Sequence, residues 1–172
     1  YYTLLGVKAD YSREVLAIIN FPEESAIGWK KVLEDIKQRG VLSVGLFVSD
    51  GLTGLENSIA KTYPKSAHQS CVLHLKRNIS SQLRKVDKPI MIDELKYVFD
   101  PDNPSYTAKQ AEVNFSTLMN KWSTKYPSLN KYLKQTNLHK YFTYLNYDYR
   151  IRRMIYTTNW IERLNKSFKR SL

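Results

Sequence analysis

Two carboxylates in this sequence have neighbours that suit metal-dependent chemistry. Asp50 ends the apolar run VLSVGLFVSD and is followed by Gly51, which allows the chain to turn sharply. Glu162 is the only acid in the basic stretch MIYTTNWIERLNKSFKR, residues 154–170. An aspartate at the carboxyl end of a buried strand is well placed to hold a hard cation such as Mg²⁺, which binds oxygen ligands. We therefore treat Asp50 and Glu162 as candidate ligands of a divalent ion.

Each acid also has an ordinary structural interpretation. Asp-Gly is a common turn at the end of a strand. Asn159-x-x-Glu162 is a capping-box pattern, in which the glutamate reaches back to the first amide of the helix. An acid flanked by cations has its charged form favoured, which suits a metal ligand and a phosphate-facing surface equally. The residues alone leave both interpretations open.

The positive charge of the chain is concentrated in its last seventy residues. The formal net charge is +11, and residues 103–172 hold 13 lysines and arginines against only Glu112, Asp148 and Glu162. Such a segment attracts polyanions, because contacts with phosphates release counterions. A solvated basic surface without a ligand is the alternative.

Cys71-x-x-His74 is half of a zinc signature, whereas a closed zinc site needs four ligands. The other histidines are His68 and His139, and there is no second cysteine, so zinc is not expected. With one cysteine the chain forms no internal disulfide, which fits a reducing compartment. No apolar run is long enough to cross a membrane.

The hydrophobic pattern predicts a sheet that carries helices, followed by a helical region. Strands are expected at 1–9, 14–21, 41–51 and 66–75, and the run 41–51 should be buried on both faces. Helices are expected at 25–40, 52–64 and from about 157, and residues 78–145 show mainly helical spacing. The last helix should bury Ile161, Leu164, Phe168 and Leu172, with Trp160 also in the core.

Two long motifs resemble a known family. VSDGLTGLENSIAKTYPKSAHQSCVLHLKRN, residues 48–78, and YTTNWIERLNKSFKR, residues 156–170, are similar to segments of the bacterial Mutator-type (MULE-like) insertion-sequence transposases. LLGVKADYSREVLAI and the stretch from Trp122 to Leu129 fit the same pattern in the same order. The resemblance covers essentially the whole chain.

The resemblance implies an α/β fold: an RNase H-like catalytic core, a mixed sheet flanked by helices, with an all-α insertion before the C-terminal catalytic helix. Residues 1–77 would be the core without its first strand, 78–153 the mainly helical insertion, and 154–172 the helix with the catalytic glutamate. Asp50 would be the second catalytic aspartate of a DDE enzyme. The first aspartate would lie upstream, so this fragment alone should be inactive, and Asp10 is a residue of a polar turn.

The same resemblance implies two-metal cleavage and strand transfer with Mg²⁺ or Mn²⁺ at the ends of the mobile element. DNA, at element ends and target, would be the partner, with a homo-oligomer in the synaptic complex, in the bacterial cytoplasm near the nucleoid. The alternative is a non-catalytic, DNA-binding remnant. The motif positions are Cys71, His74, Arg77, Asn78 and Asn159, and the expected phosphate contacts are Arg163, Lys166, Lys169, Arg170, Arg152 and Arg153.

Overall fold

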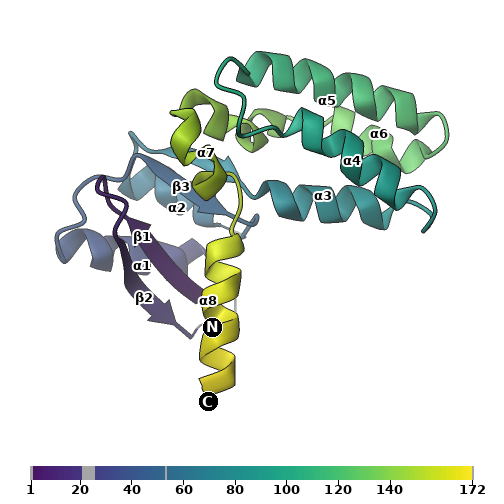
Figure 1. Cartoon of the computed structure of the whole chain (residues 1–172). Helices are drawn as coiled ribbons and strands as arrows, with labels where there is room; N and C mark the ends of the chain where they lie inside the picture. The colour runs from purple at the N-terminus through teal and green to yellow at the C-terminus, as the bar shows by residue number, and fades with distance from the viewer. Residues whose placement is uncertain (1, 21–25, 53, 172) are drawn as a thin grey trace. The chain divides into compact units, whose positions relative to one another are not determined.

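The computed structural model describes residues 2–20, 26–52 and 54–171, and for 26 and 167–171 the backbone alone (Figure 1). The chain divides into two compact units. Unit 1 combines Tyr1–His68 with Thr158–Leu172, and unit 2 is Gln69–Thr157. The division after residue 77 that the sequence suggested falls within a helix of unit 2, Val72–Ser81.

Unit 1 begins with an antiparallel hairpin. Strand β1, Tyr2–Val7, pairs with β2, Arg13–Ile19, with a register irregularity between Leu4 and Leu5. In the turn between them, the Asp10 carboxylate accepts hydrogen bonds from the amide and the hydroxyl of Ser12. Asp10 therefore acts as a turn residue, as the sequence predicted.

A second pair of strands, β3 (Leu46–Ser49) and β4 (Ala67–Ser70), follows in the chain. Helix α1, Ala26–Gln38, precedes β3, and helix α2, Leu55–Thr62, links β3 to β4. The two helices pack against each other and form the core of unit 1. Both strand pairs contribute half-buried side chains to this core, whose buried members are Trp29, Leu33, Ile36, Leu55, Ile59 and Tyr63.

Two of the predicted strands are too long. β3 covers only Leu46–Ser49, and Leu42, inside the predicted strand, is 74% exposed. The preceding carbonyls are bonded by side chains instead of a neighbouring strand, because Tyr63 donates to Val41 O and Ser66 to Val44 O. The predicted strand 66–75 ends at Ser70, since the apolar residues after it have helical spacing and start helix α3, Val72–Ser81.

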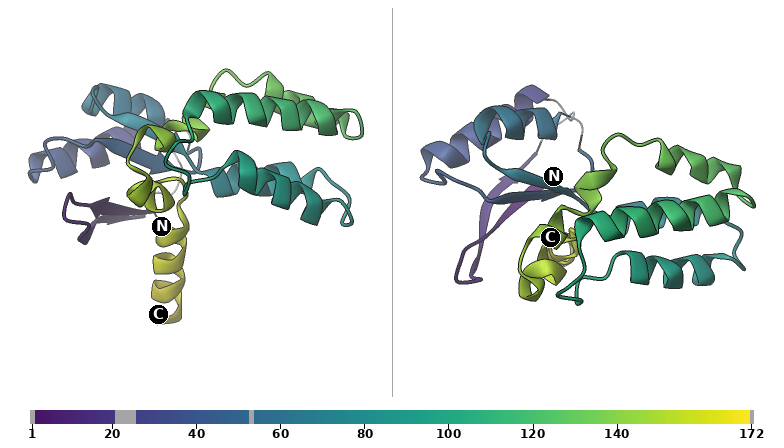
Figure 2. Two further views of the ribbon diagram at one scale, coloured as in Figure 1. Left: turned by 45° about the horizontal axis from the view of Figure 1, so that its top comes forward. Right: turned by 90° about the horizontal axis from the view of Figure 1, so that it is seen from above.

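Unit 2 is helical after β4, in agreement with the helical spacing of residues 78–145. Its main helices α3, α4 (Lys88–Val98) and α5 (Ala108–Ser123) pack in succession (Figure 2). Short elements complete it: η1 Pro127–Leu129, α6 Asn130–Leu133, η2 Leu138–Tyr141, η3 Thr143–Asn146 and α7 Tyr149–Ile155.

The core of unit 2 is aromatic. Phe99 stacks on Phe142 with ring centroids 5.1 Å apart, and Phe115 meets both rings edge-on. Four α5 residues at helical spacing are all buried: Phe115, Leu118, Met119 and Trp122. Helix α5 begins with a capping box between Thr107 and Gln110.

Candidate functional site

Asp50 lies directly after β3, at its carboxyl end, and is exposed. The following Gly51 has φ +84°, a left-handed conformation that disfavours residues with a Cβ. Gly54, just before α2, also has positive φ, at +76°. The sharp turn predicted after Asp50 is therefore confirmed, and its two glycines let the chain pass from β3 into α2 while presenting the carboxylate to solvent.

Glu162 is the fourth residue of helix α8, Asn159–Ser171, and is half-buried. The Thr158 carbonyl accepts hydrogen bonds from the amides of Ile161 and Glu162, which places Thr158 in the N-cap position. A capping box puts its acid at the third helical residue, which is Ile161 here, so the predicted capping box between Asn159 and Glu162 is wrong.

The face of α8 that carries Glu162 is turned toward the hairpin. Asn165, three residues further along, accepts a 2.7 Å hydrogen bond from the Thr3 hydroxyl of β1, and α8 contacts β1. Residues three apart lie on one side of a helix, so Glu162 shares this side with Asn165. Thr3 alternates with Tyr2 and Leu4, which join the α1–α2 core on the other face of the strand.

Trp160 is not a core residue, contrary to the prediction. Its side chain is 37% exposed, and the Arg13 guanidinium of β2 lies 3.7 Å from the centre of the indole ring. The stacked guanidinium is compatible with exposure because it keeps its edge in water. Of the predicted stripe, Ile161 and Leu164 are half-buried, and the side chains of Phe168 and Leu172 lie outside the described residues.

Two of the predicted phosphate-binding cations, Arg163 and Lys166, are exposed on α8. Lys169 and Arg170 belong to the same helix, but their side chains lie outside the described part of the chain. Arg153 of α7 is exposed and forms a two-pronged ion pair with Asp102.

Arg152 is a correction to the predicted set. Its side chain is buried in unit 2, and the guanidinium donates to the carbonyls of Tyr147, Leu145 and Asn103 at 2.9, 3.0 and 2.8 Å. A guanidinium occupied by backbone carbonyls cannot hold a phosphate as well. Arg152 is therefore a structural residue.

Cys71 and His74 also differ from the predicted strand. Cys71 is buried at the N-cap of α3, and His74 is half-buried in its first turn. Arg77 and Asn78 are exposed further along the helix.

Lys76 of α3 lies with its ammonium 5.3 Å from the centre of the Phe99 ring. Burial, with Lys96 nearby, lowers the pKa of Lys76 to about 8.

Asp50 and Glu162 both belong to unit 1, and both are carboxylates, the donor type that Mg²⁺ and Mn²⁺ bind. Within residues 2–20, 26–52 and 54–171, no three histidine, cysteine, aspartate or glutamate side chains gather closely enough to hold a metal ion. The donor type of the two acids suits a hard cation, and a site for one would need donors beyond these two residues.

A contact that sequence reasoning missed lies beside Asp50. The Ser49 hydroxyl is 2.8 Å from His68 Nε2, and His68 Nδ1 is 3.3 Å from a carboxylate oxygen of Glu56. These residues come from β3, β4 and α2, and no spacing in the sequence indicates that they meet. In the sequence, His68 is notable only as a histidine outside the Cys71-x-x-His74 pair.

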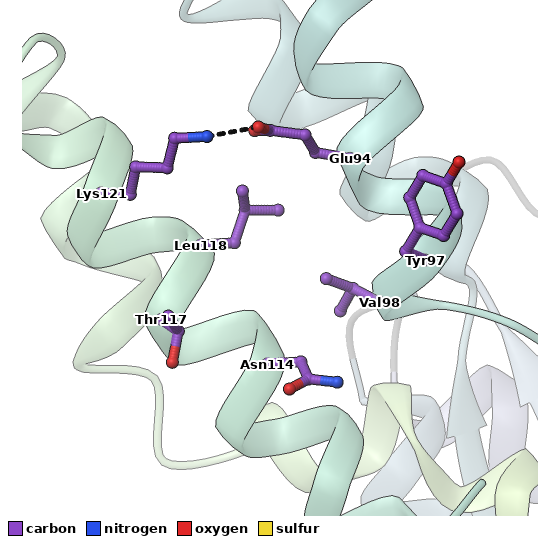
Figure 3. Close-up of a pocket in the computed structure, with 7 residues that line it drawn as sticks. All are labelled: Glu94, Tyr97, Val98, Asn114, Thr117, Leu118 and Lys121. Atoms are coloured by element: carbon purple, nitrogen blue, oxygen red, sulfur yellow. Dashed lines mark hydrogen bonds and ion pairs between the residues drawn. The ribbon is translucent and has the colours of Figure 1, made fainter.

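A shallow pocket of about 310 Å³ lies between α4 and α5 of unit 2 (Figure 3). Glu94 bridges the two helices by binding Lys121 and the Trp122 indole N–H. The pocket contains neither candidate acid, because both belong to unit 1. Among the described helices, none has the length and apolar character needed to cross a membrane.

Comparison with known proteins gives a consistent result. A family model described as "Transposase, Mutator family" matches residues 1–172. The chain is 32% identical over 166 residues to the transposase for insertion sequence element IS905 of Lactococcus lactis, covering 96% of the chain and 41% of that protein. It is 31% identical over 171 residues to the IS1201 transposase of Lactobacillus helveticus, covering 99% of the chain and 45% of that protein. The chain therefore spans less than half the length of these relatives.

Proposed function

This chain belongs to the Mutator family of transposases, and we propose that it forms part of an RNase H-like catalytic core that cleaves and joins DNA at the ends of an insertion sequence. In this proposal, Asp50 and Glu162 are two of three DDE carboxylates that hold Mg²⁺ or Mn²⁺. The observation that carries the proposal is their placement: one acid follows a strand at an exposed, glycine-flanked turn, and the other lies on the hairpin-facing side of α8 in the same unit.

The arrangement of strands supports a core completed by another segment of the whole protein. β1–β2 and β3–β4 form separate pairs among the described residues, yet Leu4 of β1 and Phe47 of β3 join one hydrophobic core. We propose that a further strand lies between β1 and β3 and carries the third acid. Helices α1 and α2 on one face of the hairpin and α8 on the other fit this fold.

In this proposal, one set of residues of this chain binds the metal ions and another set contacts the DNA backbone. Bound divalent ions would supply the Lewis acidity that phosphodiester cleavage and strand transfer require. Asp50 and Glu162 would hold those ions and would carry no catalytic proton. Arg163 and Lys166, exposed on α8, contact backbone phosphates and position the strand without reading its sequence.

The test uses the full-length transposase with a labelled duplex of the element's end. Asp50→Asn and Glu162→Gln should each lower the Mg²⁺-dependent nicking rate by at least about 100-fold, while DNA affinity stays within a few fold. Glu34→Gln is the matched control, because Glu34 is an exposed acid paired with Lys30 on α1. Its nicking rate should equal that of the wild type.

Three outcomes can be distinguished. Loss of nicking in the two acid variants alone supports the proposal. Wild-type rates in either acid variant would remove that residue from the metal site. A wild-type protein that binds the DNA and never nicks it, with Mg²⁺ or with Mn²⁺, would be the non-catalytic DNA-binding alternative.

A further inference from the structure

We propose that His68 is a positioning residue for the Asp50 carboxylate, because its imidazole ring joins the two ends of the turn that carries Asp50. The inference rests on the metal-binding role proposed for Asp50. It adds a residue that touches neither the metal nor DNA, and that acts through the geometry of this turn.

The ring contacts both ends of the turn. On one side, Nε2 is 2.8 Å from the hydroxyl of Ser49, the residue directly before Asp50. On the other side, Nδ1 is 3.3 Å from a carboxylate oxygen of Glu56, the second residue of α2. His68 itself belongs to β4, whose start is fixed by a hydrogen bond from the Ala67 amide to the Gly45 carbonyl.

The turn after Asp50 contains two glycines, so contacts that restrain its backbone matter. Gly51 and Gly54 both have positive φ, and a Cβ built on Gly51 would meet nothing within 4 Å. Glycine leaves the backbone many accessible conformations, and at Gly51 the surrounding space is open as well. Fixing Ser49 and Glu56 to one ring limits those conformations, and therefore the positions that the Asp50 carboxylate can adopt.

The contacts from Ser49 to His68 and from His68 to Glu56 also resemble a catalytic triad, in which a histidine and an acid activate a serine nucleophile. The burial of Ser49 argues against that role, since this side chain is only 5% exposed and cannot reach a substrate. The His68 side chain is likewise only 10% exposed. Nε2 and the Ser49 hydroxyl are within hydrogen-bond distance, while Nδ1 and the Glu56 carboxylate lie at the distance of a charge contact. The array is therefore suited to holding the backbone in place.

The expected effect is on metal affinity. Removing residues that orient metal ligands typically weakens metal binding by about 10–100-fold. His68→Ala should therefore raise the Mg²⁺ concentration needed for half-maximal nicking by about 10-fold or more, and saturating Mg²⁺ should recover most of the maximal rate. Ser49→Ala should shift the Mg²⁺ requirement in the same direction.

The experiment uses the full-length protein and two readouts. The first is the Mg²⁺ dependence of nicking. The second is hydrogen exchange of the amides of residues 50–52 and 54–55 in metal-free protein, which does not depend on activity. His139→Ala is the matched control, because His139 is an exposed histidine of η2 in unit 2. His68→Gln, which can still bond to Ser49, should restore part of the loss.

Faster exchange at the turn, together with a raised Mg²⁺ requirement in His68→Ala and not in His139→Ala, supports the inference. An unchanged turn and an unchanged Mg²⁺ requirement in a folded variant would overturn it, as would a lower maximal rate with the same Mg²⁺ requirement. If His68→Ala does not fold, Ser49→Ala decides by the same criteria. If Asp50→Asn nicks like the wild type, Asp50 is removed from the proposed metal site, and hydrogen exchange still decides whether His68 restrains the turn.

Discussion

Truncating Arg152 to alanine removes a buried guanidinium that connects separate segments of unit 2. The side chain is 6% exposed. Its Nε donates to Tyr147 O, its Nη2 to Leu145 O and its Nη1 to Asn103 O. The first two carbonyls precede α7 by a few residues, whereas the third belongs to the loop before α5. The variant therefore leaves carbonyls in distant parts of the chain without their donor.

The magnitude follows from the number of bonds lost. A hydrogen bond from a charged group contributes about 1.5–3 kcal/mol, and a buried carbonyl left without a donor costs about 1–3 kcal/mol. Asn103 is exposed, so water can replace the guanidinium there. The remaining losses give an expected destabilisation of about 3–5 kcal/mol, a large part of the roughly 5–15 kcal/mol that stabilises a typical domain.

Native-state hydrogen exchange on the full-length protein measures this change within unit 2. Amides of α7 should exchange at least about 100-fold faster in Arg152→Ala, since every 1.4 kcal/mol corresponds to a factor of ten. Arg153→Ala is the matched control, because the neighbouring arginine is exposed and its pair with Asp102 is solvated. If the two variants exchange alike, the assignment of Arg152 as a structural residue is wrong.

Two further predictions concern unit 2. Asp148 caps α7 by accepting from the Arg150 amide, and hydrogen bonds from the Arg150 side chain and amide lower the pKa of Asp148 to about 2. Because the folded-state pKa is depressed, this contribution is full above the unfolded pKa of about 4 and is lost as the pH falls toward 2. The protection of the α7 amides, measured relative to their intrinsic exchange rates at each pH, should fall in this window, and Asp148→Asn should remove that pH dependence. Phe115→Ala leaves a cavity against Phe99 and Phe142. In urea titrations this variant should lower the free energy of unfolding of unit 2 by about 3–5 kcal/mol. Val113→Ala, on the exposed side of α5, is the control and should change the free energy of unfolding little.

The helices could be predicted from the sequence because their signals are local. The apolar spacing of α1 and α5 and the stop at Gly40 lie within each segment. Asp50 could be found for the same reason, since an apolar strand, an acid and a glycine follow one another. Glu162 was proposed from its motif, and the orientation of its helix face toward β1 is inferred from the contact between Asn165 and Thr3, which are distant in sequence.

The sequence-based predictions fail where contacts between residues distant in sequence determine the local structure. The segment before β3 has the composition of a strand, but Tyr63 and Ser66 bond its carbonyls and leave Leu42 in solvent. Arg152 and Arg153 are adjacent in a basic stretch, and only the fold buries one of them. His68 is unremarkable in sequence because its two partners lie on other elements.

The edges of the hairpin bear on where a further strand would pair. At β2, the guanidinium of Arg39, just after α1, donates a 2.7 Å hydrogen bond to the Leu16 carbonyl. A cationic side chain at a sheet edge opposes pairing with a further strand. The described residues provide no strand on the other side of β1. A strand added there would correspond to the further strand proposed between β1 and β3. The segment that completes the sheet would then also bring its acid to the other two, so that stability of unit 1 and metal binding should be lost together when that segment is removed.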